Sequence, residues 1–373
     1  MSDNERANIH AESGSKSMRE AGRTRADLDT PALWVDLDTM ERNIAELARH
    51  FAAAQVQWRP HIKGIRVPAI AHKAIAAGAI GVTCATIREA EAMAESGVSD
   101  ILIANEIVGK RKISRLAQLC RRADVKVIID NVDNVRALSA AACRHGVRIG
   151  VLIDINTGMN RTGLRPGFAV VELAQAVNQC EGLRFLGLMT WEGHTLALAD
   201  PEARAQAATG AIKQLVAMAE ACRAAGLEVP IVSGGGSGTY KTTPFIKGMT
   251  EIQAGGAIFC DVIYRSWGVE TTPCLFVRTI VSSRPAPDRI VIDAGFKTLP
   301  VWHAQPSCAK LEAVMSHVTS AEHGIITLER ADERVKVGDL LDFIVGYTDS
   351  TIILHRKLYG IRRGLVEAEL DVI

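Results

Sequence analysis

Eight short apolar runs alternate with helix-like segments between about residues 38 and 255 of this 373-residue chain. The runs are continuous, as at 101–104 (ILIA) and 125–130 (VKVIID). Such runs are expected when both faces of a parallel strand are buried. Eight strand–helix alternations over roughly 220 residues predict a (β/α)8 barrel. A doubly wound parallel sheet is the alternative, because a single missed strand would change the count.

After about residue 270 the pattern changes to short β-rich segments separated by turns, which predicts an all-β C-terminal domain. We therefore expect a polar tail at 1–25, a barrel domain at 26–268 and a β domain at 269–373, with the strand-like segment 30–37 as a candidate to pair into the last. The barrel strands are expected at 55–58, 80–84, 100–104, 125–130, 148–155, 183–189, 229–233 and 250–254. The helices are expected at 40–54, 67–77, 87–96, 112–122, 131–145, 168–178, 204–225 and, briefly, near Phe245.

Composition excludes several classes of function. A net charge of +1 provides no basic field for nucleic acid. No apolar stretch approaches the roughly 20 residues of a membrane span, and the first 25 residues lack the apolar core of a signal peptide. The 8 cysteines are scattered, without a C-x-x-C pair, and most lie in apolar runs. Buried, reduced cysteines of a cytoplasmic protein are therefore expected.

The chemistry is expected at the carboxyl ends of the strands, where barrels of this kind place their active sites. A lysine in a turn, Lys63, follows the first strand within the segment RPHIKG. A glycine-rich run at 233–240 (SGGGSGTY) follows the seventh strand, and Gly255 and Gly256 follow the eighth. A lysine amine can bind an aldehyde, and backbone N–H groups can hold a phosphate. The combination favours a pyridoxal 5'-phosphate (PLP) enzyme, although a surface lysine and tight turns would explain each part alone.

The sequence resembles fold-type III PLP enzymes, the alanine-racemase barrel family, and within it the D-threonine aldolase and D-serine dehydratase branch. The similarity covers most of the chain after the tail. It is carried by the segments DTPALWVDLD (29–38), RPHIK (59–63), residues 77–109, NTGMNRTG (156–163), GLMTWEGH (187–194), VSGGGSGTY (232–240), EIQAG (251–255), IDAGFKT (292–298) and SAEHG (320–324).

The resemblance implies roles for individual residues. Lys63 would bind the cofactor covalently, and Arg161 would contact its phenolic oxygen. The phosphate would be cradled by Ser233, Gly235, Gly236, Ser237, Gly238, Gly255 and Gly256. His194 is the best candidate for the general base, since a neutral imidazole can take a hydroxyl proton near pH 7; a histidine merely packed at the rim is the alternative. His61 and the pair Glu322–His323 are weaker candidates, while Asp36 and Asp154 are expected to be structural.

The chain departs from this branch at its metal motif. Relatives carry His-x-Asp or His-x-Cys near the C-terminus, whereas this chain retains Asp349 but has Tyr347 in place of the histidine. A neutral phenol is a poor ligand for Mn²⁺, Mg²⁺ or Zn²⁺. His355 lies six residues beyond Asp349, which in an extended strand would be roughly 20 Å away, too far to substitute. Residues 64–66 (GIR) also differ from the relatives. Metal binding is therefore left open.

The resemblance implies a PLP-dependent lyase that cleaves the Cα–Cβ bond of a D-3-hydroxy-amino acid, as D-threonine aldolase does, giving glycine and an aldehyde. A D-amino-acid dehydratase, of the D-serine or 3-hydroxyaspartate type, and a racemase remain alternatives, as does a PLP-carrier protein with little turnover. The expected partner is a small-molecule substrate, not nucleic acid or a membrane. A homodimer with the active site at the subunit interface is also implied.

Overall fold

The computed structural model describes residues 22–373, so the polar tail expected at 1–25 lies outside the described residues up to position 21. The chain divides into two compact units. One comprises residues 43–258 and 264–271 together with Ile373. The other comprises residues up to Arg42, residues 259–263 and residues 272–372.

The first unit contains the eight-stranded parallel sheet that the alternating pattern predicts. Its strands are β2 (Gln57–Trp58), β3 (Val82–Cys84), β4 (Asp100–Glu106), β5 (Asp124–Ile129), β6 (Ile149–Asp154), β7 (Leu183–Met189), β8 (Ile231–Gly234) and β9 (Glu251–Ile252), in the spatial order β2-β9-β8-β7-β6-β5-β4-β3. A parallel bridge between His61 and Thr83 joins the two ends of this order. The sheet therefore closes on itself, and the (β/α)8 barrel is confirmed.

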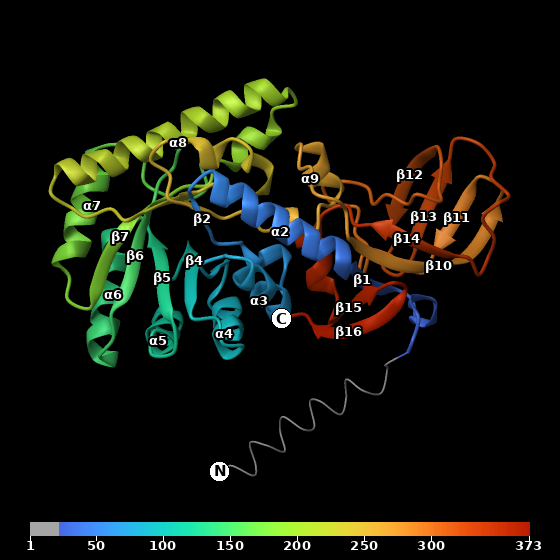
Figure 1. The fold of residues 1–373 in the computed structure, drawn as a ribbon, viewed down its shortest axis with the longest axis horizontal. Helices are drawn as coiled ribbons and strands as arrows, with labels where there is room; N and C mark the ends of the chain where they lie inside the picture. The colour runs from blue at the N-terminus through green and yellow to red at the C-terminus, as the bar shows by residue number, and fades with distance from the viewer. Residues whose placement is uncertain (1–21) are drawn as a thin grey trace, which may run out of the picture. The chain divides into compact units, whose positions relative to one another are not determined.

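Helices alternate with these strands, as the blue-to-yellow colour sequence of Figure 1 shows. They are α2 (Leu37–Ala53), α3 (Pro68–Ala76), α4 (Ile87–Glu95), α5 (Lys110–Leu119), α6 (Val132–His145), α7 (Phe168–Gln179) and α8 (Pro201–Ala224), and the short helix expected near Phe245 is the 3-10 turn η6 (Thr243–Phe245). Several begin at a side chain that accepts a backbone N–H, such as Asn131 at α6 and Asp200 at α8. These caps explain why the helices begin so close to the ends of the preceding segments.

The inside of the barrel has an apolar layer with a polar layer below it. The apolar layer is made by Leu102, Ile128, Leu152, Leu186 and Met189, which come from β4 to β7. Burying such side chains stabilises the fold by roughly 1.5–3 kcal/mol each relative to exposure. Because these residues alternate with the helix-facing ones, each barrel strand is buried on both faces, as the continuous apolar runs predict.

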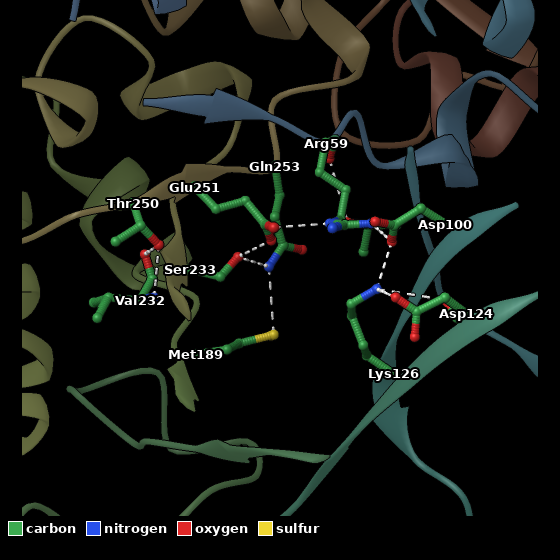
Figure 2. Close-up of polar contacts among 11 residues, drawn as sticks. Arg59, Asp100, Asp124, Lys126, Met189, Val232, Ser233, Thr250, Glu251 and Gln253 are labelled. Atoms are coloured by element: carbon green, nitrogen blue, oxygen red, sulfur yellow. Dashed lines mark hydrogen bonds and ion pairs between the residues drawn. The ribbon is translucent and has the colours of Figure 1, made fainter. Parts of the chain in front are cut away.

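The polar layer is a chain of charged side chains that crosses the barrel (Figure 2). The Arg59 guanidinium is fully buried and donates to Glu251 Oε2 at 2.9 Å and to Asp100 Oδ1. Lys126 Nζ donates to the same Asp100 oxygen at 2.7 Å and to Asp124 Oδ2 at 2.8 Å. These contacts link β9, the segment after β2, β4 and β5. Buried charges are tolerated in a barrel only when they are paired in this way.

The second unit is an antiparallel sheet with one parallel pair. Its strands are β1 (Ala32–Asp36), β10 (Leu275–Ala286), β11 (Arg289–Ile292), β12 (Val314–Thr319), β13 (Gly324–Leu328), β14 (Leu340–Ile344), β15 (Lys357–Arg362) and β16 (Leu365–Asp371). Strand β1 pairs antiparallel with β10 and parallel with β15. The early strand is thus part of the same sheet as the C-terminal strands, and the expected β-rich C-terminal region is confirmed.

All eight cysteines are free, and five of them are buried. Cys143 differs from the expectation, because it lies on the outward side of α6 and is exposed. Within the part of the chain that the structure describes, no helix combines the length and the apolar character needed to cross a membrane.

Candidate active site

The residues expected to carry chemistry lie at the carboxyl ends of the barrel strands. Lys63 is in a 3-10 turn, η3 (Ile62–Gly64), just after β2. The turn begins at His61, whose Nδ1 accepts the Lys63 backbone N–H at 3.3 Å. Arg161 lies in the loop after β6, His194 follows β7 in η4 (Gly193–Ala197), and the glycine-rich run follows β8. These segments therefore open on one end of the barrel, where a site for a small molecule is expected.

Trp191 connects the lysine to the glycine-rich run. Its indole ring centre lies 6.0 Å from Lys63 Nζ. The same ring lies against Gly236, where a Cβ atom would come within 2.5 Å of Trp191 Cζ3, and against Gly193. Sequence reasoning gave no role to this tryptophan, although it lies within the quoted segment GLMTWEGH (187–194). Glycine at 236 is therefore required by the close approach of an aromatic ring.

The glycine-rich run is fixed from below by Glu192. This side chain is fully buried, and its carboxylate accepts the Gly235 N–H at 3.1 Å and the hydroxyls of Thr239 and Thr243, both at 2.7 Å. Gly235 has φ +70°, a conformation that favours glycine. Because a buried donor or acceptor left without its partner is costly, these three hydrogen bonds hold the run in one conformation. Glu192 lies within the quoted segment 187–194, but sequence reasoning did not identify this function.

The glycine-rich run and the segment after β9 are joined to each other. The run continues into the 3-10 turn η5 (Ser237–Thr239), and the segment after β9 continues into η7 (Gly256–Ile258); Ser237 Oγ accepts the Ala257 N–H at 2.8 Å and joins the two turns. Among the described residues no acceptor contacts the backbone N–H groups of Ser237, Gly238, Gly255 and Gly256. Ser237, Gly255 and Gly256 are buried. Buried N–H groups normally have partners, and convergent ones suit a phosphate, so the residues present fit this part of PLP.

Ser233 has a different environment from the rest of the expected cradle. It lies within β8, and its hydroxyl donates to Glu251 Oε1 at 2.7 Å in the barrel interior. Gln253 donates to the same hydroxyl at 2.8 Å (Figure 2). The Ser233 side chain therefore supports the strand from which the glycine-rich run departs and is engaged with protein groups.

The loop that carries Arg161 is held by two carboxylates. Asp154 Oδ2 accepts the Thr162 hydroxyl at 2.8 Å, and Asp130 Oδ2 accepts the Gly163 N–H at 3.1 Å. The Arg161 side chain is exposed, and among the described residues no hydrogen bond or ion pair of this side chain is present. The guanidinium is therefore fixed at its backbone while its donors are available to a ligand, and Asp154 has the structural function that was expected.

Two histidines lie at this end of the barrel. Burial lowers the pKa of His61 well below its usual value, and the positive charges of Lys63 and Arg161 lower it further, so His61 is neutral. Its ring already accepts the Lys63 N–H, which suits orientation of the lysine turn. His194 faces the Arg161 loop, since a Cβ atom on Gly158 would come within 2.5 Å of His194 Nε2. His194 Nδ1 is buried and without a partner among the described residues, as expected for a nitrogen that meets a bound molecule.

The residues of the expected metal motif lie in the second unit. Tyr347 is the residue before the short helix α10 (Thr348–Thr351), and its hydroxyl donates to Asp349 Oδ2 at 2.8 Å. Between Asp349 and His355 the chain is helical, continuing through η8 (Ile352–Leu354), so the extended spacing of roughly 20 Å was wrong. His355 Nε2 instead contacts the Thr298 carbonyl at 2.8 Å.

This donor set does not fit a divalent metal. The Tyr347 hydroxyl is protonated and donates its hydrogen to Asp349, so it offers a cation no anionic oxygen. The same hydrogen bond occupies Asp349 Oδ2, which a metal would otherwise need. Within residues 22–373, no group of three or more histidine, cysteine, aspartate or glutamate side chains is placed to hold a metal ion. Glu322, the other weak candidate with His323, is exposed and pairs with Lys297.

Comparison with known proteins defines the family. Residues 35–262 match the family described as alanine racemase, N-terminal domain, and residues 274–361 match a putative serine dehydratase domain. The first match covers more than half of the chain, so the chain belongs to the alanine racemase N-terminal domain family.

Particular relatives are similar over nearly the whole length. The chain is 32% identical to a D-threonine aldolase of Arthrobacter sp, with 93% of each chain covered. It is 34% identical to a 3-hydroxy-D-aspartate aldolase of Paracoccus denitrificans, with 93% of this chain and 92% of the relative covered. The solved D-threonine aldolase from Filomicrobium marinum superimposes with a TM-score of 0.90 at 36% identity, covering 95% of this chain and 97% of that one.

Proposed function

We propose that the protein is a PLP-dependent lyase that cleaves the Cα–Cβ bond of a D-3-hydroxy-amino acid and releases glycine and an aldehyde. The observation that carries the proposal is the convergence of Lys63, Trp191 and the unpaired N–H groups after β8 and β9 at one end of a barrel of this family. Two similar relatives, a D-threonine aldolase and a 3-hydroxy-D-aspartate aldolase, support this reaction class.

PLP, when bound, supplies an electron sink for the pair left on Cα when the bond breaks. Lys63 would hold the cofactor aldehyde through Nζ, and the N–H groups of Ser237, Gly238, Gly255 and Gly256 would bind its phosphate. Arg161, fixed through Thr162 and Gly163, would donate to the cofactor's phenolic oxygen.

His194 would remove the proton from the substrate's β-hydroxyl. Its unpartnered Nδ1 and its position beside the Arg161 loop support this assignment. His61, held neutral between two cations, would orient the Lys63 turn and would not compete for that proton. Trp191, whose ring centre lies 6.0 Å from Lys63 Nζ and which packs on Gly236, would shield the side of the lysine next to the glycine-rich run.

No step is assigned to a divalent metal, because the Tyr347–Asp349 hydrogen bond is a poor donor set for one. The chain's own groups, His194 foremost, must then orient and deprotonate the β-oxygen.

The first experiment combines an absorbance spectrum of the purified protein with product assays. D-threonine is added, and glycine and acetaldehyde are measured in the same tube, with L-threonine as the stereochemical control. We expect a visible band of the lysine-linked cofactor, glycine release from the D-isomer only, and loss of both in Lys63→Ala. Lys112→Ala, on the exposed face of α5, should behave like the wild type. A colourless wild-type protein, or a band that survives Lys63→Ala, would refute the assignment of Lys63.

A dehydratase is the second candidate, favoured by the match of residues 274–361 to a serine dehydratase domain. It would release an oxo-acid and ammonia in place of glycine, so the same tube separates the two reactions. Solvent deuterium at Cα without either product would indicate a racemase, and a coloured but inert protein would indicate a carrier.

The state of the protein in the cell is part of the same proposal. The family resemblance supports a homodimer, which sedimentation of the holoenzyme would test. The eight free cysteines fit a reducing compartment such as the cytoplasm.

A further inference from the structure

Three carboxylates line the inside of the barrel at its active-site end. Strand register pairs Glu106 with Ile128 and Ile129 with Ile153. Alternate residues of a strand share a face, so Asp130 lies on the face of Ile128, and Asp154 on the face of Leu152. Ile128 and Leu152 belong to the apolar layer inside the barrel. The side chains of Glu106, Asp130 and Asp154 therefore project above this layer, at the ends of β4, β5 and β6.

Two of the three are already engaged in holding the Arg161 loop. Asp154 accepts the Thr162 hydroxyl and Asp130 accepts the Gly163 N–H. These contacts fix the two residues that directly follow Arg161, so the arginine leaves the backbone beside this carboxylate group.

Glu106 differs from its two neighbours. Its Oε1 atom is buried and has no hydrogen-bond partner among the described residues. A buried carboxylate oxygen without a donor is costly, since the desolvation of the group is not offset. The cation whose charge acts on Glu106 is Arg161, which leaves the loop held by Asp154 and Asp130 and whose guanidinium has no hydrogen bond or ion pair within residues 22–373. Among the described residues, the Glu106 Oε1 atom thus lacks a donor and the Arg161 guanidinium lacks an acceptor, and both groups belong to the same end of the barrel.

We propose that Glu106 is a positioning residue for Arg161: its ionised carboxylate pairs with the guanidinium and holds it over the barrel opening, where Arg161 contacts the cofactor. Arginine suits this function because its fork can donate to a carboxylate with one edge and to a ligand oxygen with another. The inference rests on the proposed function, because it assigns a use to the contact between Arg161 and PLP.

The electrostatics of the site agree with a proton equilibrium on Glu106. The pKa of Glu106 is raised to about 7, mainly by burial and also by the charges of Asp154 and Asp130, against the lowering effects of its own backbone N–H and of the Arg161 charge. Burial also raises the pKa of Asp154, against the opposing effects of the Thr162 hydrogen bond and Arg161. Pairing with Arg161 therefore becomes stronger as Glu106 loses its proton, and a perturbed pKa of this kind is typical of a functional site.

The test measures the affinity of cofactor-depleted enzyme for PLP by absorbance titration between pH 6 and pH 8.5. The variants are Glu106→Gln, Arg161→Gln and the double variant. Glu228→Gln, an exposed carboxylate just before β8, is the matched control. The isosteric Glu106→Gln change keeps the shape of the side chain and removes its titration, and Glu106→Asp serves as a second variant that retains the charge.

We expect Glu106→Gln to weaken PLP binding about tenfold at pH 8.5, the scale of one lost charge-assisted hydrogen bond, and progressively less toward pH 6. In the Arg161→Gln background the same change should have no further effect, since the two residues act as a unit. Glu106→Asp should recover part of the affinity.

Additive effects of the two substitutions, or an equal loss at every pH, would mean that Glu106 is only structural and would overturn the inference. Unchanged binding in Glu106→Gln would overturn it as well, while leaving the proposed function intact. Failure of the wild type to bind PLP at all would refute the proposed function and the inference with it.

Discussion

Lys63 and Trp191 meet across the barrel opening, with the lysine Nζ 6.0 Å from the centre of the indole ring. The two residues follow β2 and β7, which are not neighbours in the barrel. The same indole packs on Gly236, so one aromatic ring sets the distance between the lysine and the turn that would bind a phosphate.

Gly236→Ala should displace this ring. The added methyl group would come within 2.5 Å of Trp191 Cζ3, closer than non-bonded atoms approach. Overpacking of this kind costs about 1–3 kcal/mol, so we expect the affinity for PLP to fall by about tenfold or more in an absorbance titration. Gly210→Ala, in α8 with open space around the new methyl group, is the control and should bind PLP normally with equal or higher stability. Normal PLP binding by Gly236→Ala would show that the indole does not set the cradle.

Glu192→Gln should destabilise the protein. The carboxylate accepts three hydrogen bonds while fully buried, and an amide in its place would direct an N–H at a donor. We expect a loss of about 1–3 kcal/mol in the free energy of unfolding, measured by urea denaturation, together with weaker PLP binding. If the variant unfolds at the wild-type urea concentration, the glycine-rich run is held by its own turns and not by Glu192.

Glu106 should make stability depend on pH. Its pKa in the folded protein is raised to about 7, mainly by burial, from an ordinary value of 4.5. A raised pKa means that the stabilising contribution is present below the unfolded value and is lost as pH rises through about 7. Glu106→Gln removes this loss, so we expect the variant to gain about 1–2 kcal/mol on the wild type between pH 5 and pH 8.5, after allowance for partial exposure.

Thermal melts of the cofactor-free proteins across this pH range would measure the difference. A wild type and a Glu106→Gln variant with parallel pH profiles would show that Glu106 is already ionised in the absence of the cofactor.

Tyr347→His should create a metal site. The substitution removes the hydroxyl that occupies Asp349 Oδ2 and adds an imidazole two residues away. We expect the wild type to hold no Mn²⁺ at Asp349 in equilibrium dialysis, and Tyr347→His to bind it at least about tenfold more tightly, since a lost or gained ligand changes affinity on that scale. Adding Asp349→Asn should abolish the gain, and Tyr347→Phe should not produce it. Stoichiometric Mn²⁺ on the wild type that Asp349→Asn removes would contradict the prediction.

Periodicity predicted the barrel well because burial on both faces leaves a continuous apolar run at every strand. The strand ends, and with them the positions of Lys63 and the glycine-rich turns, followed from that pattern, whereas the roles of Arg161 and His194 were expected from the family resemblance. Trp191 and Glu192 were harder to assign, because their contacts are with residues far along the chain that the sequence does not pair. The spacing between Asp349 and His355 was wrong because a strand was assumed where a Thr-Asp-Ser-Thr segment forms a helical turn. Cys143 was expected to be buried because of its alanine neighbours, yet its own position on α6 faces outward.

The chain of charged side chains inside the barrel determines where the barrel sheet is expected to open in acid. Strands β2 and β9, which meet at the lysine side, are only two residues long each, so few backbone hydrogen bonds hold them. Arg59 compensates by joining Glu251 of β9 to Asp100 of β4. Burial would raise the pKa of Asp100, but its hydrogen bond and ion pair with Arg59 lower the pKa overall. The Arg59–Asp100 ion pair is therefore present at neutral pH and is lost as acid protonates the carboxylate. In acid, the barrel should therefore open first between β2 and β9, beside Lys63. Amide hydrogen exchange in residues 57–63 should then accelerate at a higher pH than exchange in β4 to β7.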